Sequence, residues 1–143
     1  MKTLLFTVGL PRSGKSTWAK STGLPIVNRD SIRLALHGQP FLKESEDMVT
    51  AMEKYMVKSL FLAGHDTIII DATNLKIKYI KAWKYLGIEN VKFKFKVFDT
   101  QIHTCIERAF ATNKPFLVPV IESMFEDFTA LLDEIYSKEN YKS

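Results

Sequence analysis

The chain has 143 residues with 46% hydrophobic and 25% charged side chains, which excludes a mainly disordered chain and fits one domain over residues 1–143. Its single cysteine, Cys105, excludes an intramolecular disulfide and indicates a reducing, cytoplasmic compartment. The apolar runs are only a few residues long, as at Ile68–Ile70, so we expect no transmembrane helix and no signal peptide. The formal net charge of +4 is by itself weak evidence for any partner.

Strands and helices alternate through the first part of the chain. In order, the pattern predicts a buried strand, a helix, a second strand and a second helix, over Thr3–Val8, Lys15–Ser21, Pro25–Asn28 and 30–36. Asp30 or Ser31 is placed to cap the second helix.

Residues 44–63 predict a long amphipathic helix with acidic residues near its N-terminus. Apolar side chains recur along it at helical spacing, and we expect this face in the core: Met48, Met52, Tyr55, Met56, Leu60 and Ala63. Methionines at this spacing indicate packing rather than a ligand site.

The second half of the chain continues the alternation. It predicts a strand, a helix, a strand and two helices, over Thr67–Asp71, Leu75–Leu86, Val91–Phe98, 100–111 and 119–136. Lys92, Lys94 and Lys96 alternate with apolar residues, which favours a strand with one solvated face near a sheet edge. The order predicts an α/β fold with a short parallel sheet of four or five strands flanked by helices.

The residues after the first strand carry the clearest motif. They read G-x-x-x-x-G-K-[ST] and comprise Gly9, Leu10, Pro11, Arg12, Ser13, Gly14, Lys15, Ser16 and Thr17. Between a strand and a helix, this pattern is the phosphate-binding P-loop, whose glycines let backbone N–H groups point at phosphate oxygens. Lys15 is placed to bridge the phosphates and Ser16 to offer its hydroxyl to magnesium, so we expect ATP and Mg²⁺ as cofactors.

An acidic residue, Asp71, ends the third predicted strand. In a P-loop fold an acid at this place holds the magnesium hydration shell, so Asp71 is our second candidate metal residue. The competing interpretation is that Asp71 caps the helix that follows.

Several classes of P-loop protein do not fit. The Asn-Lys-x-Asp pattern of GTPases is missing, no Asp-x-x-Gly switch follows a strand, and the chain is short for a motor ATPase. An adenylate-kinase-like kinase remains, with the segment Thr112–Val118 placed as its mobile lid.

Five segments carry a family resemblance: MKTLLFTVGLPRSGKSTWAKS, IVNRDSIRL, IIIDATNL, KVFDT and VPVIESMFEDF. In this order, over about residues 1–130, the chain resembles the 5′-hydroxyl polynucleotide kinase family, above all its phage-type kinase domain. The resemblance implies that Asp30 is the general base on the acceptor hydroxyl and that Arg33 binds the phosphate on its 3′ side. Thr73 and Asn74 would help to shape the acceptor site.

The spacing of Asp30 and Arg33 agrees with these roles, because residues three apart share a helix face. Phosphoryl transfer needs an acid beside the incoming hydroxyl and a cation that steers an anionic acceptor. The alternative is an N-cap and a helix-surface arginine without a role in chemistry.

The predicted lid departs from the family pattern, because it contains no arginine. Arg108, one helical turn earlier, or Lys114 is then expected to neutralise the transition state, although a lysine offers no bidentate fork. The 3′-phosphatase motif of many family members is also absent, which favours a stand-alone kinase.

The sequence therefore predicts ATP-dependent phosphorylation of 5′-hydroxyl DNA or RNA ends, in a bacterial or phage-infected cell, with the oligomeric state left open. Residues 1–43 carry seven basic side chains and one acidic side chain, and four of these basic residues lie in or beside the proposed sites: Arg12, Lys15, Arg29 and Arg33. Two other functions remain, a kinase for a nucleoside, sugar or antibiotic, and a nucleotide-binding module without transfer.

Overall fold

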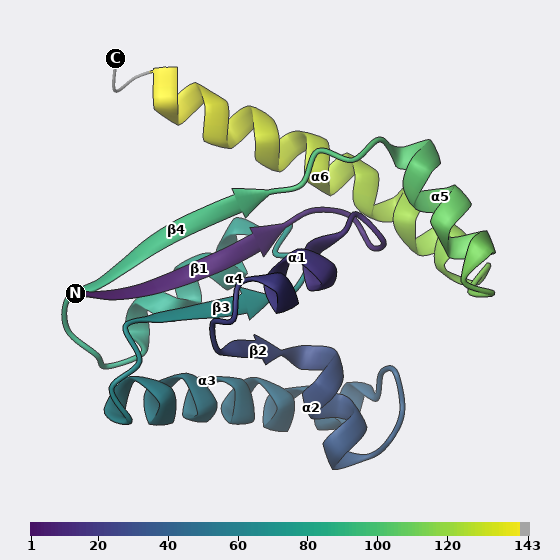
Figure 1. Cartoon of the computed structure of the whole chain (residues 1–143). Helices are drawn as coiled ribbons and strands as arrows, with labels where there is room; N and C mark the ends of the chain where they lie inside the picture. The colour runs from purple at the N-terminus through teal and green to yellow at the C-terminus, as the bar shows by residue number, and fades with distance from the viewer. Residues whose placement is uncertain (141–143) are drawn as a thin grey trace.

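A computed structural model describes residues 1–140, with side chains up to residue 134. At its centre lies a parallel sheet in the strand order β2–β3–β1–β4 (Figure 1). The strands span Lys2–Val8 for β1, Ile26–Asn28 for β2, Thr67–Asp71 for β3 and Val91–Val97 for β4. Because the strands are parallel, the side chains that follow their carboxyl ends meet at one end of the sheet. The predicted α/β fold is confirmed.

Two pairs of helices lie near the edge strands of this sheet. Figure 1 shows α2 and α3 beside β2, and the pair α5 and α6 near the opposite edge strand, β4. The bounds are Lys15–Ser21 for α1, Arg29–Leu36 for α2, Glu46–Leu62 for α3, Ile77–Ala82 for α4, Ile102–Ala111 for α5 and Leu117–Asn140 for α6, with 3₁₀ turns η1 at Lys43–Ser45 and η2 at Trp83–Tyr85. None of the described helices is both long and apolar enough to cross a membrane.

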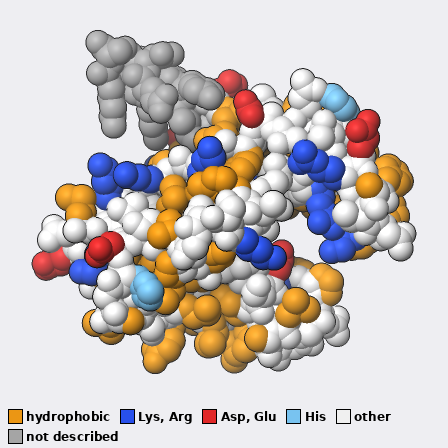
Figure 2. All heavy atoms as spheres, viewed as in Figure 1, with side chains coloured by type: hydrophobic (Ala, Val, Ile, Leu, Met, Phe, Trp, Pro, Cys, Tyr) orange, Lys and Arg blue, Asp and Glu red, His pale blue; other side chains and the backbone are white. Residues whose placement is uncertain are grey.

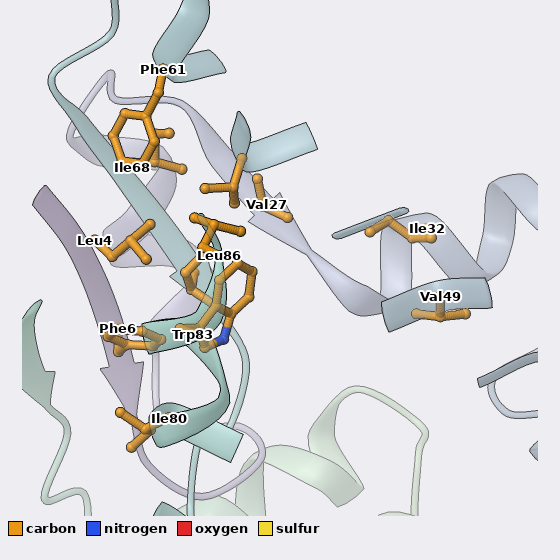
Figure 3. Close-up of a cluster of buried hydrophobic side chains, with 12 residues drawn as sticks. Leu4, Phe6, Val27, Ile32, Val49, Phe61, Ile68, Ile80, Trp83 and Leu86 are labelled. Carbon is orange, nitrogen blue, oxygen red and sulfur yellow. The ribbon is translucent and has the colours of Figure 1, made fainter. Parts of the chain in front are cut away.

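Two apolar clusters hold the helices on the sheet. The larger one joins β1, β2 and β3 to α2, α3, α4 and η2 (Figure 3), and it consists of Leu4, Phe6, Val27, Ile32, Val49, Val57, Phe61, Ile68, Ile70, Ile80, Trp83 and Leu86. The second lies under α5 and α6 and consists of Val8, Leu10, Leu75, Cys105, Ala109, Ile121, Phe128 and Leu131. Because Leu10 belongs to the phosphate-binding motif, the second cluster anchors that loop.

The predicted core face of α3 is wrong for its exposed members. Met48, Met52 and Tyr55 are exposed, whereas Met56 and Leu60 pack against the larger cluster. The buried face is instead formed by Val49, Glu53, Val57 and Phe61. A glutamate in the middle of that face argued against burial, but its carboxylate pairs with an arginine of α2.

Two other predictions meet different outcomes. The strand β4 lies at the sheet edge with Lys92, Lys94 and Lys96 exposed, as predicted. The helix predicted over Leu75–Leu86 is shorter, since α4 begins only at Ile77 and ends before η2. Asn74 adopts a positive φ of 50°, which keeps the segment before α4 out of the helix.

Candidate functional site

The loop between β1 and α1 curls because two residues enter the left-handed region, Arg12 at φ 66° and Gly14 at φ 100°. Gly9 is required for space, since an added Cβ would lie 2.8 Å from Ser13 Oγ and 3.1 Å from the carbonyl oxygen of Phe98. Gly14 gives α1 no side-chain cap, and the buried Nε of Arg12 has no hydrogen-bond partner among the described residues. Donors without acceptors in a curled loop fit an anion such as the phosphates of ATP.

Lys15 is buried and folded back onto its own loop. Its Nζ donates to the carbonyl oxygen of Leu10 and, at 3.3 Å, to Ser13 Oγ. Burial lowers the pKa of Lys15 to about 8, although the negative charge of Asp71 acts in the opposite direction. The loop therefore holds a cation that lacks a strong anionic partner, and phosphate oxygens in this place would supply one.

Asp71 and Ser16, the two predicted metal residues, are brought together. Asp71 Oδ2 accepts a hydrogen bond from Ser16 Oγ at 2.8 Å, and its Oδ1 accepts one from Thr7 Oγ1 at 3.2 Å. A hydroxyl and a carboxylate oxygen are ligands that Mg²⁺ prefers, with water and phosphate at its other positions, so these residues fit that ion. The helix α4 has Lys76 as its N-cap residue, so the interpretation of Asp71 as a cap is wrong.

Asn28, at the end of β2, joins Asp71 to the start of α2. Its Nδ2 donates to Asp71 Oδ2 at 3.0 Å, and its Oδ1 accepts from the N–H of Ser31 at 2.9 Å. Asn28 is therefore the N-cap of α2, and the prediction that Asp30 or Ser31 caps this helix is wrong. The side chain of Asp30 is 79% exposed, so its carboxylate is open to an incoming group. An asparagine directly before a helix was the signal that could have found this cap.

Arg33 is held between two carboxylates. Its Nη1 donates to Asp30 Oδ1 at 2.8 Å, while Nε and Nη2 donate to the two oxygens of Glu46 at 2.8 and 2.9 Å. The hydrogen bonds with Glu46 raise the pKa of Arg33, and they lower the pKa of Glu46 to about 2. The structure thus brings the predicted pair Asp30 and Arg33 together, and Glu46 of α3 fixes their relative orientation.

A second arginine, Arg29, docks α2 on α3. Its Nη1 donates to Glu53 Oε1 at 3.0 Å and its Nη2 to Glu46 Oε2 at 2.9 Å. Glu53 is buried, and this burial raises its pKa. Sequence reasoning missed both glutamates, because Glu46 lies 13 residues from Arg33 and Glu53 lies 24 residues from Arg29. The only sequence feature that pointed to these two glutamates was their position on the face of α3 that packs inward.

Of the two cations predicted near the lid, only Arg108 has a described side-chain contact with the loop. Its Nη1 donates to the carbonyl oxygen of Arg12 at 3.1 Å. Lys114 takes part through its backbone, with its N–H donating to the carbonyl oxygen of Ala109 at 2.8 Å. Because α6 begins at Leu117, the predicted lid is a short turn between two helices.

The predicted acceptor residues Thr73 and Asn74 make structural contacts with the strand ends. The carbonyl oxygen of Thr73 accepts the N–H of Gly9 at 3.1 Å. Asn74 Nδ2 donates to carbonyl oxygens at the ends of β1 and β3, the nearest at 2.6 Å. Thr100, which sequence reasoning missed, holds the loop from the other side through its hydroxyl, which donates to the carbonyl oxygen of Ser13 at 2.9 Å.

The surface above these residues is basic. Figure 2 shows a column of Lys and Arg side chains on the right of the view, between α5 and the part of the molecule formed by α2 and α3. A surface of this sign attracts anionic ligands.

Sequence comparisons place the chain among known proteins. A family model described as AAA domain matches residues 4–134. A protein of Autographa californica nuclear polyhedrosis virus, named as a bifunctional polynucleotide kinase/RNA ligase, is 30% identical over 131 aligned residues. That match covers 80% of this chain but 19% of the viral protein.

Solved structures give the same result for the fold. A chain of the Pnkp1/Rnl/Hen1 RNA repair complex matches with a TM-score of 0.78 and 27% identity, over 93% of this chain and 46% of its own length. A second structure of the Pnkp1/Rnl/Hen1 complex matches with a TM-score of 0.65 and 33% identity, over 75% of this chain and 39% of its own. This chain thus spans less than half the length of these relatives. A gluconokinase from Sinorhizobium meliloti 1021, at 16% identity and a TM-score of 0.50, shares the fold alone. The chain therefore belongs to the AAA domain family and is a P-loop kinase domain similar to polynucleotide kinases.

Proposed function

We propose that this chain is a kinase domain that transfers the γ-phosphoryl group of ATP to the 5′-hydroxyl of a DNA or RNA end. The observation that carries this proposal is the amide of Asn28, which joins Asp71 to the first turn of α2. Asp30 and Arg33 lie on that helix, so the phosphate site and the acceptor site stand at the same end of the sheet. The similarity to the viral polynucleotide kinase/RNA ligase and to the chains of the RNA repair complex supports a polynucleotide acceptor.

The loop and the strand ends would serve the nucleotide. Magnesium-bound ATP supplies an electrophilic γ-phosphorus and a stable leaving group. The N–H groups at the start of α1 and the ammonium of Lys15 would hold the phosphates. Ser16 and Asp71 would hold the metal ion through the oxygens that now share a hydrogen bond.

The acceptor side would act through Asp30 and Arg33. The Asp30 carboxylate takes the proton of the 5′-hydroxyl while that oxygen bonds to the γ-phosphorus and the bond to the β–γ bridging oxygen breaks, which releases ADP. Because Asp30 lies on the surface, a long acceptor can reach it. Arg33, whose Nη1 lies 2.8 Å from Asp30, offers its charge to the phosphate on the 3′ side of the same nucleoside.

The decisive experiment compares acceptors with labelled ATP and magnesium. We expect transfer to 5′-hydroxyl DNA or RNA oligonucleotides, and a nucleoside 3′-phosphate to be better than the free nucleoside by about tenfold to a hundredfold. Transfer to nucleosides or sugars but to no oligonucleotide would contradict the proposal in favour of a small-molecule kinase. Tight ATP binding without transfer to any of these acceptors would indicate a nucleotide-binding module.

We further propose that Arg108 is the cation that neutralises the transition state. Its hydrogen bond to the loop carbonyl of Arg12 supports this role, whereas Lys114 contributes to the turn through its backbone. Arg108→Ala is expected to lower turnover by about a hundredfold, and Lys114→Ala to change it less than about threefold. If the double alanine variant kept full turnover, neither residue would have this role.

A further inference from the structure

An exposed phenylalanine lies beside the arginine of the proposed acceptor site. Phe41, in the segment that connects α2 to η1, is 59% exposed and belongs to neither apolar cluster of the described chain. Its ring contacts the guanidinium of Arg33, whose Cζ lies over the ring at 5.9 Å from the centroid. Packing of the core therefore does not explain why a large aromatic side chain stands at this position.

A second exposed apolar side chain flanks the same site. Leu34 is 65% exposed and lies four residues after Asp30, so the two share one face of α2. Figure 2 shows hydrophobic side chains directly below the basic column, where Figure 1 places α2 and the loop after it. The hydroxyl and the phosphate of an acceptor are recognised by charged groups, so apolar side chains beside them suit a further, less polar part of the same acceptor.

We propose that Phe41 stacks on a base of the acceptor strand, an inference that rests on the proposed polynucleotide kinase function. Arg33 is expected to hold the phosphate on the 3′ side of the acceptor nucleoside, and each base next to a phosphate is joined to it through one sugar. A phosphate on Arg33 therefore brings a base within reach of a ring that contacts Arg33. Every base has a face that stacks on an aromatic ring, so this contact adds affinity without selecting a sequence.

The contact with Arg33 orients the ring before the acceptor arrives. A guanidinium over an aromatic face is attractive, and hydrogen bonds to Asp30 and Glu46 already fix this guanidinium. One side of Phe41 thus lies against a fixed group, and its exposed surface is left for the base. The ring would touch the acceptor but not the reacting atoms, so it should act on the KM for the acceptor and leave kcat unchanged.

The first test measures steady-state kinetics of the full chain with ATP, magnesium and a short 5′-hydroxyl oligonucleotide. Phe41→Ala should raise the KM for the oligonucleotide about tenfold and change kcat less than about twofold, whereas Phe41→Trp should keep the wild-type KM because its larger ring also stacks. Phe125→Ala is the matched control, since Phe125 is an exposed phenylalanine of α6, near the opposite edge of the sheet. Circular dichroism should show an intact fold, because Phe41 is exposed.

The second test uses oligonucleotides that lack single bases. With the wild type, loss of one of the two bases next to the first phosphate should raise the KM about tenfold, and loss of a more distant base should not. With Phe41→Ala the intact and the abasic acceptor should have similar KM values, because the same contact can be lost only once.

The results separate this inference from the function on which it rests. Wild-type transfer with the same KM in Phe41→Ala and Phe125→Ala would overturn the inference alone. An undiminished effect of Phe41→Ala on acceptors that lack both bases next to the first phosphate would do the same. If the wild type transferred phosphate to no oligonucleotide, the proposed function itself would be overturned, and this inference with it.

Discussion

Two regions at the same end of the sheet each present a cation, and they hold it by different means. In the phosphate-binding loop, Lys15 is buried among backbone and hydroxyl oxygens, and burial lowers its pKa to about 8. In the proposed acceptor region, Arg33 is held by hydrogen bonds to Asp30 and Glu46, and its pKa is raised. The loop cation lacks a direct carboxylate partner, whereas the acceptor cation has two.

This difference teaches how each region is prepared for its ligand. A loop with a poorly compensated cation gains from any anion that enters, so its ligand supplies stabilisation that the free protein lacks. A clamped arginine is already compensated, so its ligand gains from a fixed geometry more than from new charge pairing. Four variants or conditions probe this contrast.

The largest effect is expected from the loop. Lys15→Met removes the buried ammonium expected to bridge the phosphates and should lower phosphoryl transfer at least about a thousandfold. Lys20→Met changes an exposed lysine on the same helix and is the matched control. Steady-state kinetics with labelled ATP measures both, and similar rates for the two variants would remove Lys15 from the site.

On the acceptor side, Asp30→Asn should lower turnover by about a hundredfold or more, because the amide cannot take the proton of the hydroxyl. Asp30 is exposed, so the fold and the affinity for ATP should remain unchanged. Ser31→Ala, at the neighbouring exposed position, should keep full activity. An Asp30→Asn variant with unchanged turnover would show that this carboxylate is not the base.

The third prediction concerns how the affinity of the phosphate-binding loop for ATP depends on pH. Below pH 8 the free loop already carries the protonated lysine, so bound phosphates require no proton uptake. Phosphate contacts raise the pKa of Lys15, so above pH 8 the affinity for ATP should fall by about tenfold per pH unit. Calorimetry between pH 7 and about 10 measures this slope. Lys15→Met should remove the slope, and a wild-type affinity that stays constant up to pH 10 would refute it.

The smallest effect is expected when the ion pair between Arg33 and Glu46 is weakened. Glu46→Gln should raise the KM for the acceptor about threefold to tenfold and lower the free energy of unfolding by about 1 kcal/mol. Because the pKa of Glu46 is lowered to about 2, its contribution is present above pH 4.5 and is lost as the pH falls through 2. The stability difference from wild type should therefore be constant near neutral pH and vanish near pH 2. Glu44→Gln, at an exposed position of η1, is the control, and a difference independent of pH would contradict this account.

The loop could be predicted from sequence because its determinants are local. The two glycines, Lys15 and Ser16 stand within a few residues of one another, and their spacing alone fixes the geometry. The contact between Ser16 and Asp71 also followed, because parallel strands bring their carboxyl ends together. The alternation of strands and helices was sufficient for the fold class.

The pairing of the α2 arginines with glutamates of α3 could not be predicted, because only the packing of α2 on α3 brings these residues together. Glu46 and Glu53 had no local pattern that tied them to Arg33 and Arg29. The same gap caused the wrong core face of α3, since a buried glutamate is favourable only when its arginine is known. The methionines offered an apolar face of similar strength, and a helix with two such faces is ambiguous from periodicity alone.

The two hydrogen bonds of the Asn28 amide limit how the sequence of this domain can change during evolution. One side chain joins the carboxylate at the end of β3 to the first turn of α2, so replacement of Asn28 would disturb both the proposed metal site and the proposed acceptor site. Residues 37–42, which connect α2 to η1, have no such tie and can vary in sequence without moving that carboxylate. Changes in acceptor preference are therefore expected to arise in residues 37–42, while the residues at the start of α2 stay constant.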